Sequence, residues 1–149
     1  MEHGITMSLR RHALLMLVTL AAVAYAAPDA EPQLVVIADA RSPLTTIPIG
    51  EVRKLFLGVP LVVNNIEVVP VLNQSDPQLA EAFLQKVLFM SATVYERRMV
   101  GKVYREGGAR IAEVHSREEL VRVLAADPRR VSYASRDALP PGVKIVSEP

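Results

Sequence analysis

Two residues with ligand-binding chemistry follow the first predicted strand. Leu34–Ala38 is a β-branched run, a pattern typical of a buried strand, and Arg41 and Ser42 lie in the loop after it. In open α/β sheets, ligands bind at the carboxyl ends of strands. Arg41 and Ser42 are therefore candidate ligand-binding residues, and the alternative is that they belong to a solvated surface loop.

A second polar segment, made of Asn73, Gln74 and Ser75, follows the strand predicted over Ile66–Leu72. The next two residues, Asp76-Pro77, have the types that begin a helix, with the aspartate as cap and the proline at the first helical position. The segment fits a turn that ends a strand and caps a helix. Contact with a small anion is the alternative.

The sequence lacks the motifs of several common enzyme classes. It contains no nucleophile elbow, zinc-protease motif or phosphate loop. It has no cysteine, which excludes disulfides, thiolate metal sites and a cysteine nucleophile. His115 is the one histidine left after removal of the predicted signal peptide, too few for a multi-histidine metal site. We expect no enzymatic activity, no metal and no cofactor.

The first residues have the pattern of a secretory signal peptide. Arg10–His12 is basic, Ala13–Ala24 is almost wholly apolar, and Ala24–Ala26 has the small residues at its two ends that signal peptidase reads. A membrane anchor is the alternative, but a spanning helix needs about 20 apolar residues. We predict cleavage near Ala26 and a periplasmic location.

The predicted organisation is a signal peptide over 1–26, a mobile lead-in over 27–33 and a single domain over 34–149. Removal of the signal peptide leaves fifteen basic and fifteen acidic residues, so the mature chain is neutral. A neutral chain has no basic field to attract nucleic acid. No second apolar segment is long enough to span a bilayer. We therefore expect no nucleic-acid partner and no membrane span after cleavage.

The remaining pattern alternates between strands and helices. Helices are predicted over Pro48–Leu57, Pro77–Met90 and Ala92–Arg105, and from a capping box at Ser116 to Ala126. Two further strands are predicted over Arg130–Ala134 and Val143–Val146. Proline in the strand Ile66–Leu72 indicates an edge position or a local irregularity. The order predicts an α/β fold, a three-layer sandwich with a small, mostly parallel sheet.

Four landmarks occur in one order along the chain. They are the helix Glu51–Gly58, the strand Val68–Val71 with its polar turn, a helix around Ala82-Phe83 and Leu88, and the strand Val131–Tyr133 after Asp127-Pro128. Together they resemble the periplasmic phosphate-binding proteins of ABC transporters, specifically one lobe of this type II periplasmic-binding-protein fold. The resemblance spans about residues 34–146, and it implies a non-enzymatic binding protein.

The resemblance implies that Asn73, Gln74 and Ser75 bind phosphate or a similar oxyanion, together with the helix start behind them. Free N–H groups and the positive end of a helix dipole favour an anion there. The turn departs from the family pattern because Asn73, Asp76 and Pro77 replace the usual Arg, Gly and Thr. An acidic cap repels phosphate, and proline removes one N–H donor.

Two functional hypotheses follow. The first is a periplasmic solute-binding module that binds phosphate or a similar oxyanion for an ABC transport system. The alternative is an envelope protein–protein interaction module that kept the fold and lost the ligand site. The chain holds one lobe, whereas the family encloses its ligand between two lobes, so one lobe alone cannot bury a ligand. A homodimer could supply the missing lobe.

Overall fold

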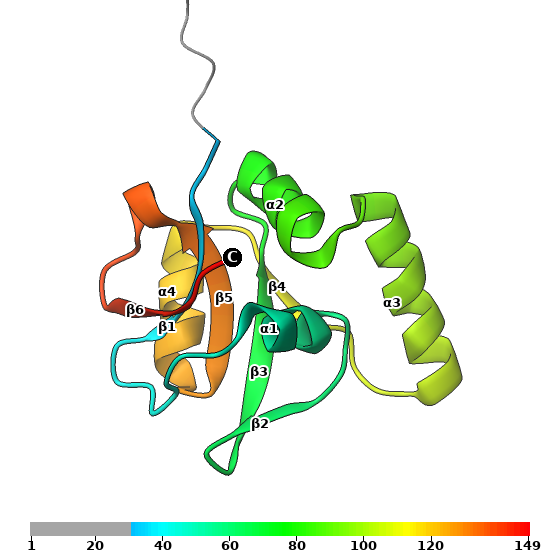
Figure 1. The fold of residues 1–149 in the computed structure, drawn as a ribbon, viewed down its shortest axis with the longest axis horizontal. Helices are drawn as coiled ribbons and strands as arrows, with labels where there is room; N and C mark the ends of the chain where they lie inside the picture. The colour runs from blue at the N-terminus through cyan, green and yellow to red at the C-terminus, as the bar shows by residue number, and fades with distance from the viewer. Residues whose placement is uncertain (1–30) are drawn as a thin grey trace, which may run out of the picture. The chain divides into compact units, whose positions relative to one another are not determined.

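A computed structural model describes residues 31–149, which fold around one six-stranded sheet (Figure 1). Its path runs β2-β3-β5-β1-β6, and β4 pairs with β3 off this path. The strands are β1 (Leu34–Asp39), β2 (Leu61–Val63), β3 (Ile66–Asn73), β4 (Ala112–Val114), β5 (Arg130–Ser135) and β6 (Val143–Ser147).

Strand direction in the sheet is mixed. Strand β3 is parallel to β4 and β5, whereas β1 is antiparallel to β5 and β6, and β2 is antiparallel to β3. The α/β class is confirmed, but the expectation of a mostly parallel sheet is wrong in this detail. All six residues of β1 are buried. The continuous apolar run in β1 indicates that both faces of this strand are covered, but it does not indicate whether the strand runs parallel or antiparallel to its neighbours.

Helices cover both faces of the sheet, which confirms the predicted three layers. On one face, α1 (Ile49–Phe56) and α2 (Pro77–Phe83) pack on Val36 and Tyr133; on the other, α4 (Arg117–Ala126) packs on Ile37. The rings of Phe83 and Tyr133 stack with centroids 3.9 Å apart. This aromatic contact fixes α2 against β5.

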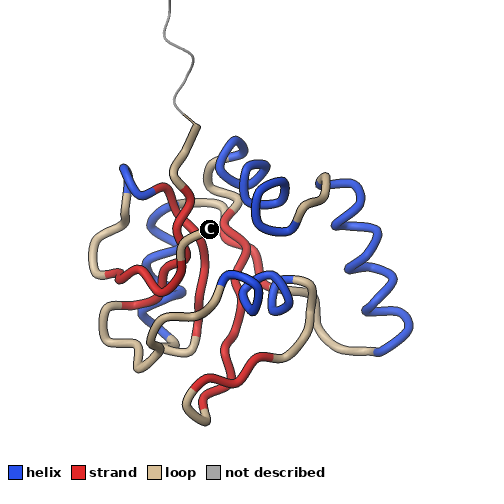
Figure 2. The backbone as a smooth tube through the Cα atoms, viewed as in Figure 1, coloured by secondary structure: helices blue, strands red, loops and turns tan. Residues whose placement is uncertain are grey.

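Helix α3 (Ala92–Glu106) stands at one side of the domain, apart from the strands (Figure 1). It follows a π-helical segment, η1 (Leu84–Leu88), that continues α2. Phe89 ends this segment in the left-handed conformation with φ of 57°. The helix predicted over Pro77–Met90 is therefore two segments, and the tube in Figure 2 turns between η1 and α3.

Two three-residue strands escaped the sequence prediction. Strand β2 forms a hairpin with β3 through Asn64 and Asn65, whose φ angles of 50° and 63° fit a tight turn of the type that joins such strands. Strand β4 pairs with β3 over Val71–Asn73. Both strands are shorter than the runs that alternation can reveal.

Pro70 lies on an inner strand of the sheet, so the edge position considered for it is wrong, and the local irregularity, the other alternative, is confirmed. Its strand β3 pairs with β5 on one side at Val69 and Pro70. On the other side, β2 pairs only up to Val68 and β4 pairs only from Val71. Pro70 therefore lies in the gap between β2 and β4. On this side no strand offers a carbonyl to an N–H at position 70, so the sheet loses no hydrogen bond to the proline.

The predicted signal peptide and most of the lead-in lie outside the described residues, so both stay predictions. Residues 31–149 form one unit. Within this unit, no helix has the length and apolar character that crossing a membrane requires.

Candidate functional site

Asn73 ends β3 with a buried side chain whose hydrogen bonds lie within the domain. Its amide donates to the carbonyl oxygen of Tyr133 at 2.9 Å. Its carbonyl Oδ1 accepts from the Ser75 N–H at 3.1 Å and from the Ser75 hydroxyl at 2.6 Å. With 2 % of its surface exposed, Asn73 joins β3 to β5 and holds the turn closed.

The helix start behind this turn is occupied by a carboxylate of the chain. Asp76 Oδ1 accepts from the N–H of Gln78 at 2.9 Å and from the N–H of Leu79 at 3.2 Å. Pro77 follows the cap and has no N–H. The predicted cap is confirmed, and these donors already hold a negative group.

Gln74 is the candidate residue of this turn that lines a cavity. The cavity has a volume of about 410 Å³ and lies between α2, η1 and the start of α3. Its lining includes the carboxylate of Glu81 and no lysine or arginine. A cavity with this lining offers no cationic group to an oxyanion.

The Arg41–Ser42 loop is also tied to neighbouring groups. Arg41 Nε pairs with Asp39 Oδ1 at 2.9 Å, and the Arg41 guanidinium donates to the Ala125 carbonyl at 3.2 Å. Hydrogen bonds from Arg41 hold the pKa of Asp39 below its usual value. The buried Ser42 donates its hydroxyl to the Pro128 carbonyl. These contacts fasten the loop to the end of α4 and the segment after it.

The two candidate segments lie at opposite ends of the sheet. Asn73 contacts the carboxyl-terminal half of β5 through Tyr133. Arg41 and Ser42 contact Ala125 and Pro128, before β5 begins, because β1 runs antiparallel to β5. The structure therefore does not bring Arg41 and Ser42 together with Asn73, Gln74 and Ser75 into one site.

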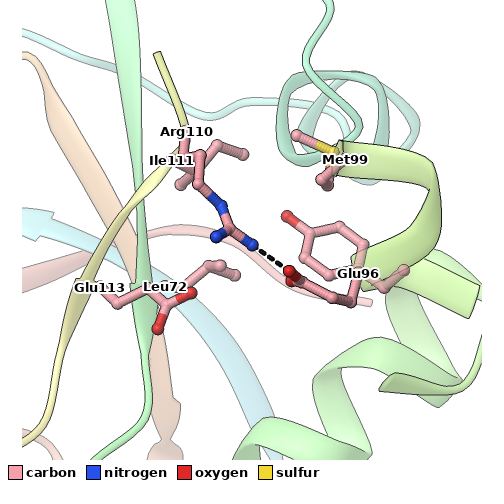
Figure 3. A pocket seen from close by; sticks show the side chains of 7 residues that line it. Leu72, Glu96, Met99, Arg110, Ile111 and Glu113 are labelled. Carbon is pink, nitrogen blue, oxygen red and sulfur yellow. Dashed lines mark hydrogen bonds and ion pairs between the residues drawn. The ribbon is translucent and has the colours of Figure 1, made fainter. Parts of the chain in front are cut away.

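A small cavity lies between α3 and β4 (Figure 3). Its volume is about 10 Å³, room for no more than a water molecule. The guanidinium of Arg110 crosses it to pair with the Glu96 carboxylate, as the dashed line in Figure 3 marks. A hollow of this volume is too small for a ligand larger than water.

A larger groove of about 550 Å³ lies beside the Pro70 gap. Val68 and Pro70 of β3 line it together with Leu55 and the segment before β4, and Glu67 and Arg130 add charge. Sequence reasoning missed this groove because it exists only where β2 and β4 leave β3 uncovered. The one sequence signal was the proline inside a strand. None of the five predicted ligand-binding residues lines it.

No group of three or more metal-binding side chains gathers within residues 31–149. Two tyrosines, Tyr95 and Tyr133, have a pKa raised mainly by burial. The Tyr95 hydroxyl donates to the Phe56 carbonyl at 2.9 Å. A buried phenol that stays protonated acts here as a packing and hydrogen-bonding group.

The sequence matches no known protein family and no curated protein. The solved structures that share its fold include the following two. An ABC-type phosphate transport receptor from Vibrio cholerae has a TM-score of 0.56 and 13% identity, over 77% of this chain and 45% of the receptor. A putative phosphate ABC transporter substrate-binding protein from Clostridium perfringens, with bound phosphate, has a TM-score of 0.53 and 10% identity, over 77% and 44%.

The fold is that of one lobe of a periplasmic binding protein. The chain spans less than half the length of either neighbour. At these identities the likeness concerns the fold alone. The predicted resemblance to one lobe is confirmed in architecture, and the role of its residues stays a proposal.

Proposed function

We propose that this domain is an interaction module on a periplasmic-binding-protein lobe, exported to the periplasm, whose partner is a protein. The observation that carries the proposal is the Asp76 carboxylate, which accepts the N–H groups of Gln78 and Leu79. In a helix start that binds an oxyanion, those donors face the ligand. Here an incoming phosphate would have to displace the Asp76 carboxylate from these N–H groups. It would also approach the negative charge of that carboxylate, which stays attached to the chain.

The hydrogen bonds of Asn73 and Ser75 give the proposal further support. The Ser75 hydroxyl and N–H both donate to Asn73, and the Asn73 amide donates to Tyr133. Binding an oxyanion with these groups would break bonds that hold the turn. A satisfied polar group that loses its partner costs free energy. The arrangement therefore favours a structural role for the turn.

Thermal melting of the mature domain with phosphate, sulfate or chloride at equal ionic strength tests the proposal. A ligand that binds the native state raises the midpoint, by about 2.7 kcal/mol of stability at a hundredfold excess over its dissociation constant. We expect no selective rise with phosphate. A rise that phosphate produces and chloride does not would overturn the proposal.

The Asp76→Asn variant sharpens this test because asparagine keeps a helix cap without the charge. We expect phosphate to leave the melting midpoint of this variant unchanged as well, because Asn73 and Ser75 stay paired. A phosphate response in the variant alone would assign the loss of binding to the charge of Asp76. In that case the turn itself would be competent for oxyanions.

Oxyanion binding for an ABC transport system is the second candidate, favoured by the phosphate receptors among the fold neighbours. It would use Asn73, Gln74 and Ser75, and a homodimer would supply the second lobe. Arg41 and Ser42 would then belong to a separate contact at the other end of the sheet. Sedimentation equilibrium with and without phosphate tests this candidate, which requires a phosphate-dependent dimer.

Export is tested separately by fractionating cells that express the full chain. We expect the full chain to yield a cleaved, shorter form in the periplasmic fraction. A chain from which residues 1–26 are deleted should instead stay in the cytoplasm. An uncleaved chain in the membrane fraction would favour the anchor alternative.

A further inference from the structure

Helix α3 packs on the domain with one narrow side. Tyr95 and Met99 are its two buried residues, four positions apart and so on the same side of the helix. The Tyr95 hydroxyl bonds to the end of α1 through the Phe56 carbonyl. The methylene groups of Lys102, on the same side, lie against Gly58. This side fixes the orientation of α3 and leaves the rest of its surface outward.

Charges at the flanks of α3 are paired. Glu96 pairs with Arg110 from the segment before β4, and the contact is drawn in Figure 3. Lys102 pairs with Glu106 one turn later on the helix. These pairs neutralise the sides of the helix next to the domain, so its remaining charge lies on the outer surface.

The outer surface carries three exposed arginines, Arg97, Arg98 and Arg105. Within residues 31–149 none of the three forms an ion pair. Val94 and Tyr104 lie among them at helical spacing and are 49% and 86% exposed. We call this set, together with Gly101, the arginine face. It combines unpaired cations with an aromatic ring whose surface is almost wholly free.

Gly101 lies at the centre of the arginine face. Glycine inside a helix destabilises it relative to alanine. A Cβ built on Gly101 would meet only the flexible end of Arg105, at 3.1 Å. Packing within the domain therefore does not require glycine here. The absent side chain leaves room for the guanidinium of Arg105, which lies over Gly101.

We propose that the arginine face docks an acidic segment of a partner protein. The inference rests on the proposed function, since it names the surface through which the module binds. Guanidinium groups form bidentate hydrogen bonds with carboxylates. Arginine and tyrosine are also enriched among the residues that contribute most to binding energy at protein interfaces. A membrane surface fits less well, because a helix that inserts at a bilayer needs a broad apolar face. Here Tyr95 and Met99 are turned into the domain, and the arginine face has Val94 and Tyr104 as its exposed apolar or aromatic side chains.

The test is fluorescence anisotropy with a labelled glutamate-rich peptide that carries leucines at helical spacing. Its twin has glutamine in place of every glutamate. We expect the mature domain to bind the acidic peptide and not the twin. Joint substitution of Arg97, Arg98 and Arg105 by glutamine should weaken binding roughly tenfold or more. Arg122→Gln, an exposed arginine on α4, is the matched control and should leave binding unchanged.

Gly101→Ala separates docking from folding. Alanine should raise the melting temperature because it favours the helix. It should also weaken peptide binding, because its methyl group would push the guanidinium of Arg105 away from its place over residue 101. Equal binding by the wild type and the triple arginine variant would overturn the docking proposal. So would an equal loss of binding in the Arg122→Gln control.

Vesicles that contain phosphatidylglycerol provide the comparison with a lipid surface. Binding to these vesicles that depends on the three arginines, without binding to the peptide, would overturn the choice of a protein partner. A selective phosphate rise in the melting test would instead overturn the proposed function, whatever the peptide does. Failure of the peptide without a phosphate response would overturn only the assignment of the arginine face.

Discussion

The turn after β3 and the outer surface of α3 differ in how their polar groups are satisfied. In the turn, Asn73, Ser75 and Asp76 bond to the domain itself. On α3, Arg97 and Arg98 are exposed and form no ion pair within residues 31–149. The comparison teaches that the turn which resembles a ligand site has its polar groups bonded within the domain, whereas the outer arginines of α3 form no ion pair within residues 31–149.

This difference predicts opposite effects of mutation in the two regions. Changes in the turn should lower stability because they break bonds inside the domain. Changes on the outer surface of α3 should alter binding and leave stability within about 0.5 kcal/mol, apart from Gly101. The following substitutions test that contrast, beginning with the largest expected change.

Asn73→Ala should reduce the free energy of unfolding by about 3 kcal/mol, because it leaves the buried Tyr133 carbonyl without its side-chain donor and removes two bonds to Ser75. Urea unfolding of the mature domain measures the loss. Ser75→Ala, which removes one of these bonds, is the control and should cost about 1 kcal/mol. An unchanged stability in Asn73→Ala would contradict the structural role of the turn.

Asp76→Ala should lower the free energy of unfolding by about 1 kcal/mol, because the N–H groups of Gln78 and Leu79 lose their cap. Asp76→Ser should retain most of the stability, since serine also caps helices. Thermal melting compares the two variants. If both are as stable as the wild type, the carboxylate does not hold the helix start, and the argument against an anion there loses its basis.

Gly101→Ala should raise the free energy of unfolding by roughly 0.7 kcal/mol, since alanine favours a helix interior over glycine. The sign is opposite to that expected in the turn. Urea unfolding measures it, and Gly58→Ala is the contrasting control. Gly58 has a φ of 81° and lies against Lys102, so alanine should destabilise the domain there. A loss of stability in Gly101→Ala would show that the domain needs this glycine.

The Asp39–Arg41 pair should give a smaller, pH-dependent effect. Because Arg41 lowers the pKa of Asp39, the pair stabilises the fold above the usual pKa of aspartate. That contribution is lost as the pH falls through the lowered value. In Arg41→Met, the difference in urea midpoint between neutral and acid pH should be smaller than in the wild type. The same difference in both proteins would contradict this account of the loop.

The sequence reveals much of the fold because several segments carry strong local signals. The run Leu34–Ala38 matches β1 to within one residue. Asp76 and Ser116 cap α2 and α4 as predicted. Glu119 completes the local bonding at α4 by accepting the His115 N–H, one residue before the Ser116 cap. Such caps and runs depend on neighbours along the chain, which a sequence displays directly.

The rest depends on contacts between distant segments. Strand β1 is buried on both faces, and its residues alone do not indicate that it runs antiparallel to β5. That direction places Arg41 at the opposite end of the sheet from Asn73. The sequence also shows the polar character of Asn73 without revealing that Tyr133, 60 residues away, satisfies it. Candidate ligand residues are therefore visible in the sequence, but whether they are free is decided by the tertiary structure.

Amide NMR during a phosphate titration of the mature domain tests the central claim most directly. The signals of Ser75, Gln78 and Leu79 report on the N–H groups that Asn73 and Asp76 hold. The account predicts no saturable shift of these three signals at millimolar phosphate. Saturable shifts with one common midpoint, absent when chloride replaces phosphate, would show that the turn binds the oxyanion and would contradict the account.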